Sequence, residues 1–416
     1  MPKKSADGQS LPPTPVEETP WPRIVRELAD DLATDAIARE RAGKSPTDEV
    51  SRLREAGLLD LLTPTRAPGQ GADWRTACAV VRETAAADSS MAELLARHYA
   101  LAWSTRFFGS TDTAGGLEAR IAEEHWLLGG SIDIPAGSPS DLTLAPTGTG
   151  YALGGRRTFA AGVTVADRLV LGATCAKTGD LLLVLVDPAH PGVLVEAANE
   201  RVGQRLAGAG SIDFDNVPVS RADQVLCTLP RDEHTTSPFT ALAPLALRLL
   251  LAHVALGLTE GALTEARDIS RAAPPFPAAG PMGGAYAERP SDDPYVLLAY
   301  GELAIGAHTA ATVVEHATQA LADAVALGPE LGVDHHADVA VLVSTAEAVT
   351  GRTAVHTTTR LLELTADADD VNGGTGLDRF WRNARVLTAR TPSSLRLRDI
   401  GDHFLNGARP PFTARV

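Results

Sequence analysis

The chain has 416 residues, 44% hydrophobic and 21% charged, an ordinary globular composition in a length that suffices for two or three domains. Its formal net charge of −15 argues against nucleic acid or an anionic membrane as a partner. It has no uninterrupted apolar stretch of about 18 residues and no N-terminal apolar signal core. Cys78, Cys175 and Cys227 lie far apart, without metal-ligand spacing. We therefore expect a cytoplasmic protein with reduced thiols, no membrane partner and no metal site.

The texture of the chain changes three times. Residues 1–22 are rich in Pro, Ser, Thr and charge, which predicts a disordered arm. Residues 23–126 show apolar positions at i, i+3 and i+4, which predicts an N-terminal α-helical domain. Residues 127–228 carry short apolar runs between Gly, Pro and Asp, typical of a small β-barrel or sandwich. Residues 229–416 hold long Ala/Leu/Val-rich segments that predict a C-terminal four-helix bundle. The predicted fold class is therefore an α+β multidomain protein.

One stretch near the end, Leu377–Gly407 (LDRFWRNARVLTARTPSSLRLRDIGDHFLNG), combines three unusual features. Four arginines recur at three- to five-residue spacing: Arg379, Arg382, Arg385 and Arg390. Much of that cation set can share one helix face. The turn Asn372–Gly376 (NGGTG) precedes it and lets the backbone bend close to a bound group. A break at Thr391–Pro392 ends this helix. A helix with Arg, Trp and Asn after a flexible turn suits an anion beside a flat aromatic ring, which predicts a flavin site.

These residues resemble a known family. LDRFWRNAR, the turn at Pro392 and IGDHFLNG look like the C-terminal end of the acyl-CoA dehydrogenase superfamily. More narrowly, they resemble its reduced-flavin-dependent monooxygenases, typified by dibenzothiophene monooxygenase. Gly154–Asp167 (GGRRTFAAGVTVAD) and Val202–Val219 (VGQRLAGAGSIDFDNVPV) fit the same pattern, and the similarity runs with gaps from about residue 23 to 407. The resemblance implies an acyl-CoA dehydrogenase-like fold and a homotetramer. The α, β, α-bundle order follows independently from the texture.

The resemblance also implies which residues bind the cofactor. In the superfamily, the strand ends that correspond to residues 129–133 and 159–162 lie along the flavin ring and offer it backbone donors. The candidates here are Ser131, Asp133, Phe159, Ala161 and Gly162. The family often has a hydroxyl near Ala161, where this chain has only a methyl. The alternative is that both stretches are ordinary turns beside strands.

Three further cofactor candidates lie in the later parts of the pattern. Arg205 belongs to a strand-linking loop that runs near the flavin edge in the family, although structural turns alone would explain this loop. Arg382 and Asn383 are candidates for binding the flavin phosphate, or alternatively for holding the bundle together.

Two residues are candidates for catalysis. In the monooxygenase branch, a histidine on the helix that holds His98 faces the flavin ring, and imidazole suits proton transfer near working pH. We expect His98→Ala to leave folding intact while uncoupling oxygen consumption from product. Arg390 could stabilise developing negative charge or bind an anionic substrate group. The alternatives are a satisfied core histidine and a salt-bridged arginine at a helix end.

The base of a dehydrogenase is missing from the positions where the resemblance would place it. Removal of a proton alpha to a thioester needs a carboxylate, and the two family positions hold Thr391 and Leu247. The two histidines that the monooxygenase branch carries after the arginine segment are replaced by Leu387 and Arg390.

The first hypothesis is a two-component flavin monooxygenase. A separate reductase would supply reduced FMN, and O2 would be used to oxygenate a small organic substrate. FMN is preferred to FAD because residues 274–290 lack the Arg-aromatic-Gly segment that helps hold the adenine half in FAD members. One alternative is an FAD-dependent acyl-CoA dehydrogenase or oxidase acting on CH–CH bonds. A third hypothesis is a flavin-free scaffold that kept the fold after losing its catalytic groups.

Overall fold

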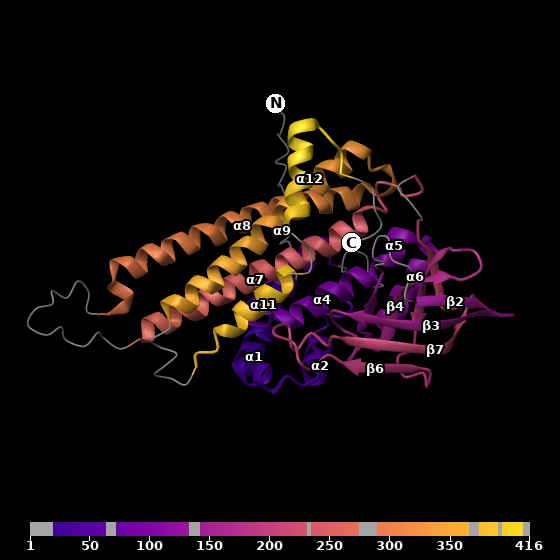
Figure 1. Cartoon of the computed structure of the whole chain (residues 1–416), viewed down its shortest axis with the longest axis horizontal. Helices are drawn as coiled ribbons and strands as arrows, with labels where there is room; N and C mark the ends of the chain where they lie inside the picture. Colours follow the sequence, from indigo (N-terminus) through magenta and orange to yellow (C-terminus); the bar gives the residue numbers. More distant parts are fainter. Residues whose placement is uncertain are drawn as a thin grey trace, which may run out of the picture.

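The computed structural model describes residues 20–63, 72–132, 142–230, 234–273, 289–365, 374–389 and 393–410. Its helices are α1 (Trp21–Ala42), α2 (Thr47–Glu55), α3 (Trp74–Ala87), α4 (Ser89–Ala102), α5 (Ser104–Phe108), α6 (Thr111–Glu124), α7 (Leu242–Ala272), α8 (Pro294–Leu327), α9 (Val333–Leu364), α11 (Asp378–Ala389) and α12 (Ser393–Asn406). Its strands are β1 (Leu128–Ser131), β2 (Leu142–Pro146), β3 (Gly150–Phe159), β4 (Arg168–Cys175), β5 (Leu181–Val186), β6 (Val193–Ala197), β7 (Gly210–Ser220) and β8 (Val225–Thr228). The order helices, strands, helices confirms the predicted fold class (Figure 1).

Helix α4 forms the centre of the N-terminal domain. Its N-cap is Asp88, whose carboxylate accepts hydrogen bonds from the backbone N–H groups of Ser90 (3.0 Å) and Met91 (3.2 Å). These are two of the donors that a helix start leaves unsatisfied. Thirteen of the fourteen α4 residues are buried, because the helix packs against α3, α7 and β1. A helix that is buried on every side runs through the interior of its protein.

The central domain is one connected eight-stranded sheet in the order β6-β7-β3-β2-β4-β5-β8, with β1 added beside β4. One edge of β4 pairs with antiparallel β5, while its other edge pairs in parallel first with β1 and then with β2. Strand β5 (LLLVLV) is buried at every position, and its alternate side chains enter two different cores. A continuous apolar run is what a strand covered on both faces requires.

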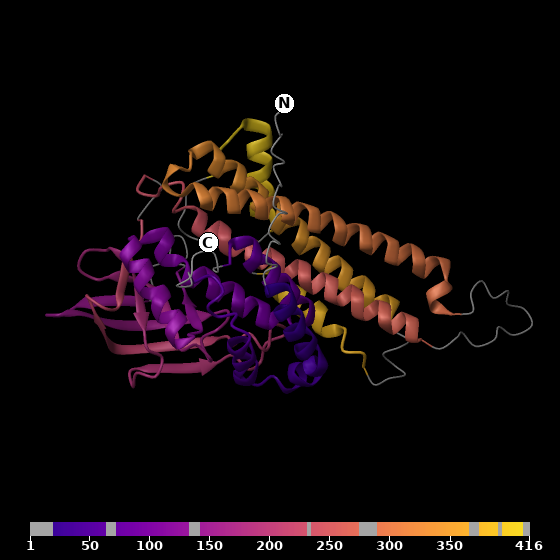
Figure 2. The same ribbon diagram turned by 180° about the vertical axis from the view of Figure 1, so that it is seen from behind.

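The C-terminal domain is a bundle of α7, α8, α9 and α11, with α12 packed on α9 (Figure 1). Helices α3 and α4 pack against it, and buried residues of α1 to α4 form one core with those of α7, α8 and α9. From behind, the N-terminal helices lie beside the bundle (Figure 2). Two glycines on α7 allow this contact. A Cβ atom at Gly257 would lie 2.1 Å from the carbonyl oxygen of Arg82, and one at Gly261 would lie 2.0 Å from that of Ala86. The backbones of α3 and α7 therefore touch.

Two helical segments, Leu242–Ala272 and Pro294–Glu330, are long and apolar enough to cross a membrane by length and composition alone. The most apolar window of the first is 83% buried inside the protein, as expected for a core helix, whereas that of the second is only 17% buried. Helix α8 thus carries large exposed apolar side chains, among them Leu297 (56% exposed), Leu298 (68%) and Ile305 (69%). An apolar surface of this extent usually marks a contact with another molecule.

Candidate active site

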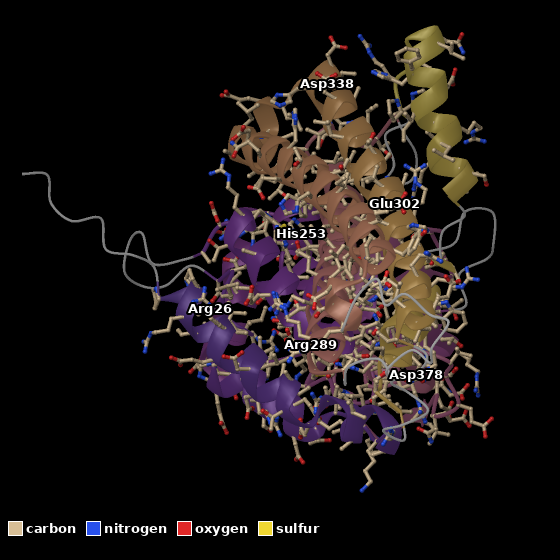
Figure 3. All side chains as sticks on the ribbon, turned by 90° about the vertical axis from the view of Figure 1, so that its left-hand side faces the viewer. Arg26, His253, Arg289, Glu302, Asp338 and Asp378 are labelled. Carbon is tan, nitrogen blue, oxygen red and sulfur yellow. The ribbon has the colours of Figure 1, made fainter. Side chains whose placement is uncertain are left out.

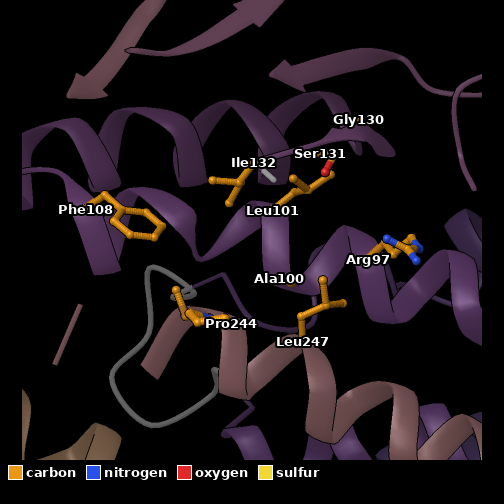
Figure 4. A pocket seen from close by; sticks show the side chains of 10 residues that line it. Arg97, Ala100, Leu101, Phe108, Gly130, Ser131, Ile132, Pro244 and Leu247 are labelled. Atoms are coloured by element: carbon orange, nitrogen blue, oxygen red, sulfur yellow. The ribbon is translucent and has the colours of Figure 1, made fainter. Parts of the chain in front are cut away.

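A narrow pocket lies where the three domains meet; its cavity volume is about 30 Å³, or about 440 Å³ when gaps between atoms and open solvent are included. Helix α4 provides Arg97, Ala100 and Leu101, α7 provides Leu247, and the end of β1 provides Ser131 (Figure 4). The surface of the lining is mainly apolar, and none of the described residues that line the pocket is a carboxylate, a histidine or a cysteine. Such a pocket can bind and orient a small molecule, but its side chains offer no base and no nucleophilic thiol.

Arg97 is the one charged side chain of this lining, and the sequence interpretation did not single it out. Its Nε donates a hydrogen bond to Oε1 of Glu93, one turn earlier on α4, at 2.9 Å. The Glu93 side chain is fully buried, whereas that of Arg97 is 15% exposed. The pair is an i, i+4 contact on one helix face, so Glu93 holds the guanidinium at the pocket. In the sequence, only the four-residue spacing pointed to this pair.

His98 is adjacent in sequence but points elsewhere. It is completely buried, its Nε2 donates to the carbonyl of Leu59 (2.6 Å), and its Nδ1 accepts from the backbone N–H of Leu128 (3.0 Å). Burial lowers the pKa of His98 to about 4, against a smaller opposing effect of the Leu59 hydrogen bond. Both ring nitrogens are therefore used by backbone groups, and the ring joins α4 to β1 and to the segment after α2. This geometry favours the satisfied core histidine over the proton donor, and catalysis by His98 stays an untested prediction.

The strand ends predicted to border the flavin lie next to each other. A Cβ atom at Gly129 would lie 3.0 Å from the carbonyl oxygen of Gly162, so β1 and the turn after β3 are in close contact. Gly162 has φ +82° and donates its N–H to the carbonyl of Ala207 (2.7 Å). Of the predicted ring-binding residues that the structure describes, Ser131 lines the pocket beside α4 and Phe159, Ala161 and Gly162 do not.

The side chains of Phe159 and Ala161 do not lie open at this junction. They are 3% and 2% exposed, and the Phe159 ring belongs to the core of the sheet. Contacts of these two residues with a cofactor would therefore have to come from the backbone. Arg201, which the sequence interpretation missed, donates to the carbonyl of Ala160 (3.0 Å) and so fixes this turn. Asp133 lies outside the described residues.

Arg205 and Arg382 line a second pocket, of about 810 Å³ including open solvent, between α1 and α11. Arg41 and Arg379 add two more guanidinium groups, opposed by Glu40 and Asp378. Arg382 pairs with both of these carboxylates, and Arg379 pairs with Glu265 on α7. The Nε of Arg205 is buried without a hydrogen-bond partner, and no described carboxylate pairs with Arg205 or Arg41. An unpaired buried donor is costly, so this pocket suits an anion.

Asn383 does not face either pocket opening but joins three elements. Its Oδ1 accepts from the backbone N–H of Gln204 (2.6 Å), and its Nδ2 donates to the hydroxyl of Ser89 at the start of α4 (3.0 Å). A Cβ atom at Gly203 would lie 2.3 Å from the carbonyl oxygen of Arg382, so the loop and α11 are in backbone contact. With its amide used in this way, Asn383 fits the alternative in which it holds the bundle, and phosphate binding by Asn383 stays a prediction.

Three predicted positions remain, of which one lies in the pocket and two lie outside the described residues. Leu247, the second family position for a dehydrogenase base, lines the pocket beside α4 and presents an aliphatic side chain there. Arg390 and Thr391 lie outside the part of the chain that the structure describes, so the role predicted for Arg390 is not tested.

A helical domain, a β-domain and a helical bundle, with an apolar pocket where they meet, are the architecture expected of acyl-CoA dehydrogenase-like flavoproteins. Residues 19–114 match the family model described as "Acyl-CoA dehydrogenase, N-terminal domain". The chain is 31% identical to "Probable FMNH2-dependent monooxygenase SfnC" of Pseudomonas putida, over 95% of this chain and 98% of that one. It is 32% identical to dibenzothiophene monooxygenase of Rhodococcus qingshengii, over 98% of each chain.

A solved structure leads to the same family. The complex of TdsC from Paenibacillus sp. A11-2 with FMN and indole superposes with a TM-score of 0.86 at 28% identity, over 96% of this chain and 100% of that one. The chain therefore belongs to the reduced-flavin-dependent monooxygenases of the acyl-CoA dehydrogenase superfamily.

Proposed function

We propose that this protein uses reduced FMN and O2 to oxygenate a small organic substrate in the pocket beside α4. The observation that carries the proposal is the lining itself. It places Arg97 and Ser131 among apolar side chains and offers no described acid–base group, so the chemistry has to come from a cofactor. Reduced FMN supplies the two electrons with which one oxygen atom of O2 enters the substrate while the other leaves as water. The relatives named above support this over dehydrogenation.

The residues present fit FMN at two places. Gly130 and Ser131 at the end of β1 line the pocket beside α4, and at Gly130, which has no side chain, a flat ring can approach the backbone. The buried, unpartnered Nε of Arg205 and the neighbouring guanidinium of Arg382 fit a phosphate. Burial raises the pKa of Glu40 in the same pocket, while Arg382 and Arg205 act to lower it.

The protein's own contribution is binding, orientation and exclusion of water. Leu101, Phe108 and Leu247 cover the pocket with apolar surface and keep bulk water from the reacting atoms. The aliphatic Leu247 removes no proton from the substrate, which argues against the alternative of an acyl-CoA dehydrogenase. We further propose that a separate cytoplasmic flavin reductase delivers the reduced FMN.

Anaerobic titration with reduced FMN and reduced FAD, followed by an oxygen pulse, tests this proposal. Reduced FMN should bind more tightly than reduced FAD, and oxygen uptake should depend on a flavin reductase. Bleaching of an oxidised flavin by an acyl-CoA without oxygen would support the dehydrogenase instead. A protein that binds neither reduced flavin would support the flavin-free scaffold.

Arg205→Gln provides the matched arm of the titration. Loss of one charge-assisted contact to the phosphate should weaken reduced FMN binding about tenfold or more, with the melting temperature unchanged. Arg26→Gln, at an exposed position of α1, serves as the control and should bind FMN as the wild type does. Equal FMN affinity in both variants would remove Arg205 from the phosphate site.

We also propose a homotetramer formed through the exposed apolar side of α8. Ile305→Arg should break this contact, because a charge buried in an apolar interface is costly. Light scattering should give four times the chain mass of 43.5 kDa for the wild type and a smaller particle for the variant. Leu194→Arg is the control, since Leu194 is similarly exposed (61%) but lies on β6. A wild-type monomer would contradict the proposal.

A further inference from the structure

We propose that the substrate of this enzyme is a small organic anion, whose oxyanion group binds Arg97 and whose apolar part lies between Leu101, Phe108 and Leu247. The proposal rests on the proposed function, because it concerns the pocket assigned there to the reaction. The chemical class is a carboxylate, sulfinate or sulfonate with a short apolar group. Figure 4 shows Arg97 at one end of the lining and Phe108 at the other, which gives the pocket a charged end and an apolar end.

Arg97 has hydrogen-bond donors that the described residues leave unused. Glu93 accepts only from Nε, at 2.9 Å, and the structure gives no other hydrogen bond to Arg97 among the described residues. The two Nη groups are therefore available at the pocket. A guanidinium edge with two parallel N–H donors matches the two oxygens of a carboxylate or sulfinate.

The guanidinium of Arg97 lies in a largely apolar environment. The Arg97 side chain is 15% exposed and lies beside apolar neighbours. Among the described residues its carboxylate partner is Glu93, which is fully buried on the same helix. A charge in such a place is stabilised by every further hydrogen-bonding anion that reaches it. No other charged residue belongs to the described lining, so within that lining an incoming oxyanion meets one cation and no carboxylate.

The other residues that line the pocket determine which apolar group the substrate can carry. Beyond Arg97 along the chain come Ala100 and Leu101 of α4 and then Phe108 of α5, with Pro244 and Leu247 of α7 facing them. This surface favours a few carbon atoms or one small ring, and it offers no carboxylate to hold a second polar group. A neutral ligand of the same shape would leave the Arg97 donors unpaired, which costs affinity.

Binding of matched ligand pairs to the FMN-loaded protein tests the proposal. The anions are propane-1-sulfinate and butanoate, and their neutral counterparts are methyl propyl sulfone and butanamide. Calorimetry should show the anions binding about tenfold or more tightly than their counterparts. Arg97→Gln should abolish that preference, whereas Arg97→Lys should keep part of it, because an ammonium group keeps the charge but not the fork.

Loss of Arg97 removes a cation from beside the buried Glu93 carboxylate, so Arg97→Gln alone could fail to fold. The double variant Glu93→Gln/Arg97→Gln removes both charges and should fold while still lacking the preference for anions. Arg26→Gln, outside this pocket, should retain it. Reduced FMN affinity, measured on the same samples, should be unchanged in all four variants.

Each outcome decides one of the two proposals. Equal affinity of wild type for anionic and neutral ligands, with normal reduced FMN binding, would overturn the anionic substrate and leave the monooxygenase standing. Weaker reduced FMN binding in the Arg97 variants, with the anion preference intact, would assign Arg97 to the cofactor and also overturn it. Absence of reduced FMN binding in the wild type would instead overturn the proposed function.

Discussion

His98→Ala is expected to lower the free energy of unfolding by about 3–6 kcal/mol, the sum of a cavity and two buried backbone groups left without partners. The imidazole is completely buried and bridges the carbonyl of Leu59 and the N–H of Leu128. The expectation from sequence was the opposite, that the variant folds normally and uncouples oxygen use. Denaturant titration followed by circular dichroism measures the loss directly.

Two control variants show how much stability is lost when an exposed histidine or a single buried hydrogen bond is removed. His308→Ala, at an exposed position of α8, should change stability by no more than about 0.5 kcal/mol. Tyr99→Phe removes one hydrogen bond, to the carbonyl of Leu58 (2.9 Å), and should cost about 1–3 kcal/mol. A His98→Ala protein of wild-type stability that consumes oxygen without forming product would restore the catalytic interpretation.

Acidification from pH 7 to pH 5 is expected to destabilise the fold steeply, because burial lowers the pKa of three histidines, His98, His253 and His336. Burial lowers the pKa of His98 to about 4 and that of His253 to about 3. Both lie below the ordinary value of 6.5, so the unfolded chain binds these protons first. Their stabilising contribution is complete above about pH 6.5 and is lost as the pH falls toward the folded values. The slope should approach about 1.4 kcal/mol per pH unit for each histidine.

His253→Gln tests how much of this pH dependence of stability comes from one histidine. His253 lies on α7 where the bundle meets the N-terminal helices (Figure 3), and its Nε2 bonds the hydroxyl of Thr318 at 2.8 Å. Glutamine does not titrate. Between pH 6.5 and 5, the free energy of unfolding of the variant should therefore depend less steeply on pH, by about the contribution of one proton, whatever its stability at pH 7. Unfolding midpoints at pH 7, 6 and 5 supply the measurement. An unchanged slope would show that His253 is not titrated on unfolding.

The fold and the enzyme class could be predicted because they follow from patterns that extend over many residues and do not depend on any single one. Helical periodicity, the all-apolar run of β5 and the order of the three textures each follow from which surfaces are buried. The predicted fold class, the reduced-flavin monooxygenase and the use of FMN are confirmed by the relatives described above. The domain boundaries and the individual cofactor residues remain predictions.

The site was harder to predict because neighbouring helix residues point about 100° apart. Arg97 and His98 stand in the same apolar sequence context, yet Arg97 faces the pocket and His98 faces the backbone of Leu59 and Leu128. No pattern in the sequence says which polar side chain meets a tertiary partner. The same limit applies to Asn383, whose amide is used by Gln204 and Ser89, groups far away in the sequence.

The backbone contact of α3 with Gly257 and Gly261 bears on how a molecule reaches the pocket. Helices α3 and α7 are in close backbone contact along two successive turns, and α4 packs on both. Hinge opening between the N-terminal helices and the bundle would have to break that seam. The helical walls therefore act as a fixed frame, so we expect product release not to depend on a hinge between α3 and α7.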